Sequence, residues 1–248
     1  MSSRSAALLL TIDTHLDAIL KYWLLVAGLA SAARIALAPN TEPVANVSTF
    51  ASYFLLVVAP FASTFLALRW FADGHRQPQP ATRLARVGRW RVVNRAEAEK
   101  HRLYGPRGIM VSLIIGMMIN VPVRAAEYFA AMPPIPIDAP RWLSALHFAM
   151  TFDVVVFTSL YMVAFVAALR RVPLFPRLLV AIWLADLAMQ LLTAQMVGTT
   201  HVPANVAVAL QHLLVGNVKK VLISMTLWLP YLLLSTRVNV TYRHRIPA

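Results

Sequence analysis

Three polar side chains stand near the middle of long apolar runs, where such groups are costly and therefore usually serve a function. Asp153 lies about midway along one run and Asp186 about midway along the next, with Gln190 one helical turn beyond Asp186 on the same face. Carboxyl groups in such surroundings could bind a proton or a cation, as in the proton relay of a transporter. The alternative is structural, with neutral, hydrogen-bonded acids that hold helices together. The sequence leaves both interpretations open.

A second set of polar residues lies in the halves of the apolar runs that are farther from the basic loops. At a rise of about 1.5 Å per residue, Arg124 and Glu127 fall in this half of their run and share one helical face. We name the set the outer-half cluster, and its members are Arg34, Arg124, Glu127, His147, Lys219 and Lys220, with His201, Gln211 and His212 nearby. Two interpretations stay open. The basic side chains extend to the membrane interface, or they form a cationic pocket for an anionic headgroup or similar ligand.

Sequence patterns of known enzyme chemistry are missing. The chain has no H-E-x-x-H, no G-x-S-x-G, no P-loop and no G-x-G-x-x-G. It also has no cysteine, which excludes disulfides, thiolate metal sites and a cysteine nucleophile. His147 and Asp153 are six positions apart, which places them on nearly opposite aspects of a helix. The sequence therefore predicts no enzymatic activity, no cofactor and no metal site.

The composition decides between a soluble and a membrane protein. Of 248 residues, 59% are hydrophobic and only 13% are charged, against about a quarter charged in soluble domains. Mean hydropathy is +0.63. The net charge of +13 could suggest nucleic acid, but the Lys and Arg residues lie between long apolar runs and form no basic domain. We predict an all-α polytopic membrane protein, with membrane lipids and not nucleic acid as its surroundings.

Six segments meet the requirement of about 20 mostly apolar residues for a membrane-spanning helix. They are residues 19–37, 49–68, 109–131, 143–169, 178–197 and 216–234. Before the first of them, Asp13, His15 and Asp17 interrupt a short apolar patch, so we expect the N-terminus to be retained and not cleaved as a signal peptide. The sequence thus predicts a bundle of six transmembrane helices.

The basic residues predict the orientation of this bundle, because positively charged loops stay in the cytoplasm. Arginines and one lysine crowd residues 69–107, and further arginines follow the fourth and sixth spans, whereas the other loops contain only Arg141. Six spans place all of these basic segments on one side, so both termini are expected to be cytoplasmic. We divide the chain into a two-span hairpin (1–76), a cytoplasmic basic loop (77–104) and a four-span membrane domain with a basic tail (105–248).

The basic loop has two interpretations. Leu84, Val87, Trp90 and Val93 alternate with arginines in a pattern typical of a short interfacial helix. Such a helix would attract anionic headgroups at the cytoplasmic face by roughly 1 kcal/mol per basic residue. A solvated loop that only sets the topology is the alternative, because Gly88 weakens the helix.

Two short blocks carry a resemblance to a known family. The stretch WLPYLLLSTRVNVTY resembles the closing motif of a bacterial family known as domain of unknown function 2569. The matching residues are Trp228, Pro230, Tyr231, Ser235, Arg237, Val238, Thr241 and Tyr242. The block YGPRGIMVSLII is similar to the start of the family's first span through Gly105, Pro106, Gly108 and Ile109, and departs from it at Met110, Val111, Ser112 and Leu113.

The resemblance covers about residues 104–245 and implies a small multi-span protein of the bacterial cytoplasmic membrane, with no established activity. The closing motif also has a physical interpretation. We expect Trp228 to pack with Pro230 and Tyr231 at a kink in the last span. Ser235 would then cap or back-bond the helix end, and Arg237 would lie at the cytoplasmic headgroups.

Three classes of function remain open. The preferred prediction is a non-enzymatic membrane protein that binds or moves a lipid or other anionic amphiphile through the outer-half cluster. The second is an accessory or assembly subunit whose polar residues contact a protein partner in the membrane. The third is a small proton-coupled carrier that uses Asp153 and Asp186. The first requires the basic members of the outer-half cluster to face one cavity.

Overall fold

The computed structural model describes the chain except for residues 1, 39–46, 82–83, 85–86, 137 and 200–201, so His201 lies outside the described residues. The long helices are α2 (Leu16–Ala36), α3 (Val47–Trp70), α5 (Ile109–Ala131), α6 (Arg141–Leu169), α7 (Phe175–Thr199) and α8 (Ala204–Leu234). The short elements are α1 (Ser2–Thr14), the 3-10 helix η1 (Gly74–Arg76), β1 (Trp90–Val92), α4 (Arg95–Lys100), α9 (Thr236–Arg243) and β2 (Arg245–Pro247).

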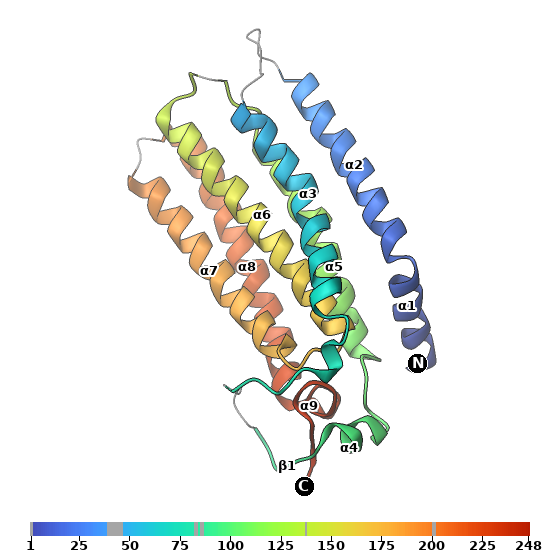
Figure 1. Cartoon of the computed structure of the whole chain (residues 1–248). Helices are drawn as coiled ribbons and strands as arrows, with labels where there is room; N and C mark the ends of the chain where they lie inside the picture. Colours follow the sequence, from blue (N-terminus) through green and yellow to red (C-terminus); the bar gives the residue numbers. More distant parts are fainter. Residues whose placement is uncertain (1, 39–46, 82–83, 85–86, 137, 200–201) are drawn as a thin grey trace.

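The protein is an all-α membrane bundle. Among the described residues, six helices are long and apolar enough to cross a bilayer, which confirms the predicted number of spans. The outer surface is apolar along the helices, with Leu29, Leu191 and Ile223 largely exposed, as expected for side chains that face lipid. Both termini lie at the same end of the bundle (Figure 1), as an even number of spans requires.

Helix α6 forms the centre of the bundle. It packs against α3, α5 and α7, while α2 lies against α3 and α8 lies against α7. Ala164, Ala167 and Ala168 are fully buried on α6, and such small side chains let neighbouring helices approach closely. The centre of α6 is therefore surrounded by protein, so a polar residue there must find its partners on neighbouring helices.

The last span is longer than predicted. Helix α8 begins at Ala204, directly after Pro203, and not near residue 216. The polar Gln211 and His212 lower the local hydropathy, but they leave the helical hydrogen bonds of the backbone intact. Lys219 therefore lies at the midpoint of a 31-residue helix and not at its outer boundary.

The described part of the basic loop and the tail form a small folded cap below the bundle (Figure 1). Strand β1 pairs antiparallel with β2, with Trp90 opposite Pro247 and Val92 opposite Arg245. The described part of 77–94 contains no α-helix, in contrast to the interfacial helix considered from the sequence. Gly88 adopts a φ of +92°, which breaks a helix at this point. Helix α4 packs on α9 instead and shields a small core.

Candidate functional site

A buried arginine joins three helices near the middle of the bundle. Arg124 of α5 donates from Nη1 to Oδ2 of Asp153 on α6 at 3.2 Å, and from Nη2 to Oδ2 of Asp186 on α7. The side chains of Arg124 and Asp186 are 11% and 0% exposed. We call these three residues the ion cluster. It brings one member of the outer-half cluster together with both central acids.

A frame of neutral polar groups completes the ion cluster. Gln190 donates from Nε2 to Oδ1 of Asp153 at 3.0 Å and to Oδ1 of Asp186 at 3.4 Å. The Tyr161 hydroxyl donates to Oδ2 of Asp186 at 3.3 Å. All four carboxylate oxygens therefore accept a hydrogen bond, which offsets part of the cost of burying them.

The guanidinium of Arg124 is held in place from several directions. Its Nε donates to Oδ1 of Asn120, one turn earlier on α5, at 3.1 Å. Its Cζ lies 5.3 Å from the ring centre of Phe157 and 5.7 Å from that of Tyr161, distances typical of cation–π contacts. Hydrogen bonds thus fix the planar guanidinium within its own plane, and the rings of Phe157 and Tyr161 contact it in addition.

The charges of the ion cluster do not balance. One guanidinium faces two carboxylates, so the ion cluster carries a net negative charge when both acids are ionised. A net charge is expensive to bury. One bound proton or one small cation would neutralise the ion cluster. This differs from the cationic pocket predicted from the sequence, because that prediction did not place the two acids beside Arg124.

Two small cavities reach the ion cluster from the side of α8. One, of about 50 Å³, is lined by Arg124, Glu127, Asn217 and Lys220, among others. The other, of about 20 Å³, is lined by Arg124, Glu127, Asn217 and Asp153, among others. Polar cavities of this size hold about one to a few water molecules. Glu127 and Lys220 form a half-exposed ion pair beside both cavities.

A hydrogen-bonded chain extends from the second cavity toward the start of α6. Tyr128 lines this cavity, and its hydroxyl lies 2.7 Å from Oγ1 of Thr151 and 3.3 Å from Nε2 of His147. His147 is buried, with 3% of its surface exposed. His147 is thus connected with the neighbourhood of Asp153 through Tyr128 and a cavity large enough for water.

The structure separates other members of the outer-half cluster from Arg124. Lys219 lines a different cavity, of about 660 Å³, between α7 and α8. Arg34 of α2 lies beside Tyr53 of α3. Arg124, Glu127 and Lys220 thus share one cavity, but Arg34 and Lys219 do not line it. The sequence-based prediction required all the basic members to face one cavity, so the structure meets it only in part. Adjacent helical residues such as Lys219 and Lys220 point about 100° apart, which explains why they reach different cavities.

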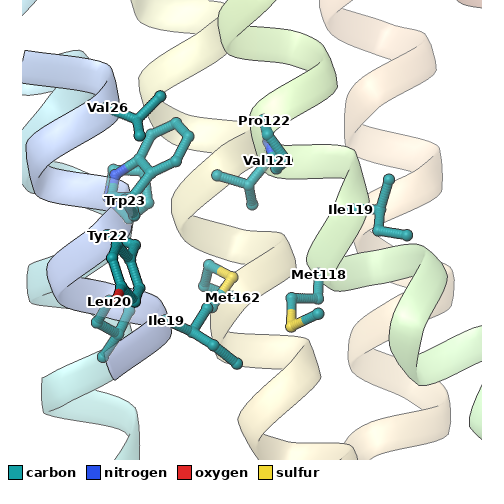
Figure 2. A pocket seen from close by; sticks show the side chains of 11 residues that line it. Ile19, Leu20, Tyr22, Trp23, Val26, Met118, Ile119, Val121, Pro122 and Met162 are labelled. Carbon is teal, nitrogen blue, oxygen red and sulfur yellow. The ribbon is translucent and has the colours of Figure 1, made fainter. Parts of the chain in front are cut away.

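A further cavity, of about 280 Å³, is lined by apolar and aromatic side chains. Figure 2 shows side chains of α2, including Trp23 and Val26, facing those of α5, including Met118 and Pro122, with Met162 of α6 between them. Trp23 donates its Nε1 proton to the carbonyl oxygen of Val57 at 2.9 Å, so its polar atom is satisfied away from the cavity. This cavity suits a hydrocarbon chain and contributes no charged group.

The residues of the closing motif join the bundle to the cap. The rings of Trp228 and Tyr231 are 5.9 Å apart in an edge-to-face contact, around Pro230 inside α8. Ser235 ends α8 and precedes α9, and its side chain makes no capping hydrogen bond. Arg237 donates to the carbonyl oxygens of Leu103 and Gly105, at 3.2 and 3.1 Å. It therefore anchors the polypeptide after α4. The location of Arg237 at the cytoplasmic headgroups stays a prediction.

The fold and the ion cluster define an integral membrane protein with a polar centre among its helices. No family model, curated protein or solved structure matches the sequence. Membership of the domain of unknown function 2569 family therefore stays a prediction. The location of the protein in a bacterial cytoplasmic membrane stays a prediction as well.

Sequence reasoning missed the partners of Arg124, although a usable signal was present. At about 1.5 Å per residue, Arg124 lies about 23 Å from the start of α5 and Asp153 about 24 Å from the end of α6. Both of these helix ends belong to the basic side. Two residues at the same depth on consecutive antiparallel spans are expected to lie close together, so the sequence could have paired Arg124 with Asp153. Tyr161, which contacts Asp186, and Asn217, which lines the two cavities, could not be found in this way, because a hydroxyl or amide inside a span is common.

Proposed function

We propose that this protein is a small proton-coupled carrier in which the ion cluster binds and releases one proton. The observation that carries the proposal is the charge imbalance, with a single buried guanidinium between the carboxylates of Asp153 and Asp186. In a surrounding of low dielectric constant, uptake of one positive charge is the simplest way to remove the net charge. The cavities beside the ion cluster have room for about one to a few water molecules, and such water molecules can pass a proton to the carboxylates.

Protonation of either acid would change how three helices are held together. Asp153 belongs to α6, Asp186 to α7 and Arg124 to α5. A neutral Asp153 would weaken its bond to Arg124 and leave the guanidinium with Asp186 alone. The protonated and ionised states thus favour different packing of these helices, which is the requirement for coupling a proton to a conformational change.

The proton-binding step can be tested without knowing a substrate. Infrared difference spectra of the protein in lipid nanodiscs, recorded during a pH titration, report buried carboxyl groups that gain or lose a proton. We expect one such band in the wild type and its loss or shift in Asp153→Asn and Asp186→Asn. Asp13→Asn is the matched control, because Asp13 lies outside the ion cluster and pairs with Arg170 at 3.2 Å. An unchanged spectrum in both ion-cluster variants would exclude the proposal.

A second candidate function is the binding of an anionic amphiphile between α7 and α8. The cavity there, of about 660 Å³, is lined by apolar side chains such as Leu191 and Leu214, with Lys219, Gln211 and Gln190 as its polar members. Lys219 forms no ion pair with any carboxylate in the described part of the chain. A hydrocarbon chain would fill the apolar part while an anionic head contacts Lys219.

This candidate has a sharp internal control. Lys219→Gln removes the cation of the α7–α8 cavity, whereas Lys220→Gln removes the neighbouring cation that pairs with Glu127. Native mass spectrometry of the protein released from lipid nanodiscs should detect a bound anionic amphiphile in the wild type and in Lys220→Gln, and lose it in Lys219→Gln. Equal retention in all three proteins would rule out Lys219 as the contact for the head.

A further inference from the structure

A group of arginines meets where the cap joins the basic end of the bundle. The ring of Tyr242 lies 5.0 Å from that of Phe175, and its hydroxyl donates to the carbonyl oxygen of Ala168 at 2.8 Å. These contacts place the end of α9 beside the start of α7. Arg243, the last residue of α9, therefore lies close to Arg177 in the first turn of α7.

Two arginines at this junction are buried more than expected for charged side chains. Arg243 is 7% exposed and Arg245, the first residue of β2, is 5% exposed. Nη1 of Arg243 donates to Oδ1 of Asn239 at 3.3 Å. Its Nη2 is buried and has no hydrogen-bond partner among the described residues. A buried guanidinium with an unused donor is costly, and an acceptor in this position would remove that cost.

The electrostatics at the junction also favour an anion. Burial, followed by the positive charges of Arg245 and Arg177, lowers the pKa of Arg243 to about 10. The acids on α4 have other partners: Glu97 pairs with Arg91 at 2.5 Å and Glu99 pairs with Arg95 at 3.3 Å. Arg243 forms no ion pair with any described carboxylate. The positive charge of Arg243 is thus not neutralised by a carboxylate of the described residues.

We infer that Arg177, Arg243 and Arg245 form a binding site for a phosphate group at this end of the bundle. Arginine forks match the oxygens of a phosphate, and each charge-assisted bond is stronger than a neutral one. A phosphate monoester carries a charge of about −1.5 to −2 at neutral pH, which opposes the repulsion among the three guanidinium groups. The N-terminus of α7, which contains Arg177, adds a favourable dipole.

The phosphate can come from a soluble compound or from a lipid headgroup, and two arms of one experiment separate these sources. In the first arm, the protein in phosphatidylcholine nanodiscs is titrated with inorganic phosphate against chloride of equal ionic strength. In the second, phosphatidic acid, a phosphomonoester lipid, is compared with phosphatidylglycerol in phosphate-free buffer. Thermal unfolding is followed in both, because a ligand that binds the folded state raises Tm. A saturable rise of Tm in the first arm identifies a soluble source of the phosphate. A rise of Tm in the second arm alone identifies a lipid source.

The arginine variants decide whether such a rise comes from this site. Arg243→Gln should weaken the apparent affinity roughly tenfold or more, as expected for a lost charge-assisted bond. Arg102→Gln is the matched control, because Arg102 is exposed and carries the same charge. Where Arg243→Gln does not yield folded protein, Arg177→Gln takes its place, since Arg177 is only partly buried. The inference is overturned when neither arm shifts Tm, or when the arginine variants and Arg102→Gln respond alike.

Discussion

Arg124 and Asp186 form an ion pair between α5 and α7 in which the carboxylate is fully buried, and the same guanidinium reaches Asp153 at 3.2 Å. No other basic side chain in the described part of the chain pairs with either acid. Arg124 is therefore the one described counter-ion of both buried acids.

Removal of that cation should be strongly destabilising. Arg124→Gln leaves two buried carboxylates without their counter-ion, and such a loss costs about 3–5 kcal/mol. We expect a large fall in the free energy of unfolding, measured in mild detergent by thermal or denaturant unfolding. Adding Asp186→Asn to Arg124→Gln should recover part of the loss, because one stranded charge is removed with its partner. A single variant as stable as the wild type would show that the acids are already neutral.

The hydroxyl of Tyr128 should matter for the speed of proton uptake more than for its extent. Tyr128→Phe removes the group that lies 2.7 Å from Oγ1 of Thr151 and 3.3 Å from Nε2 of His147. We expect a loss of about 1 kcal/mol in stability from the missing hydrogen bond, and slower protonation of the ion cluster after a pH jump. Time-resolved infrared spectroscopy measures the rate. Tyr22→Phe, at an exposed position on α2, is the control, and equal rates in both variants would remove Tyr128 from the route.

The cap should loosen as the pH falls through the ordinary range of histidine. Burial, and then the positive charge of Arg95, lowers the pKa of His244 below its usual 6.5, with Glu99 acting in the opposite direction. Below about pH 6.5 the unfolded cap takes up a proton that the folded cap does not, so acidification favours unfolding. The stability gained from a neutral His244 is thus present above its unfolded pKa and declines below it.

Hydrogen exchange across residues 87–104 and 236–248 measures this effect. Between about pH 7.5 and 5.5, protection of these segments should fall by up to roughly tenfold per pH unit once corrected for intrinsic exchange. His244→Asn removes the titrating group and keeps a residue that tolerates the φ of 47° found at this position. Its protection should vary less with pH than that of the wild type. An equal pH dependence in both proteins would assign the effect to another group.

The sequence was sufficient for the six spans but not for the neighbours of their polar residues. Hydropathy depends only on the residue types along a segment, which is enough to locate the spans. It placed the start of the last span too late, because the polar Gln211 and His212 lower the hydropathy of the first turns of α8. The shared face of Arg124 and Glu127 follows from their spacing. The partners of these two residues cannot be derived from that spacing, since Asp186 and Lys220 belong to later helices. The pairing of β1 with β2 is likewise set by contacts between distant parts of the chain.

The two blocks that carry the family resemblance contact each other, and one hydroxyl tests how much this contact contributes. Thr241 accepts a hydrogen bond at Oγ1 from the buried backbone N–H of Gly105 at 2.9 Å, and Gly105 has a φ of +92°. Thr241→Val keeps the shape of the side chain but leaves this N–H without an acceptor, which costs about 1–3 kcal/mol. Thr241→Ser retains the hydroxyl and should be nearly neutral. Hydrogen exchange at residues 103–108 should therefore accelerate in the valine variant only, and similar exchange in both variants would show that the contact between the blocks does not depend on this bond.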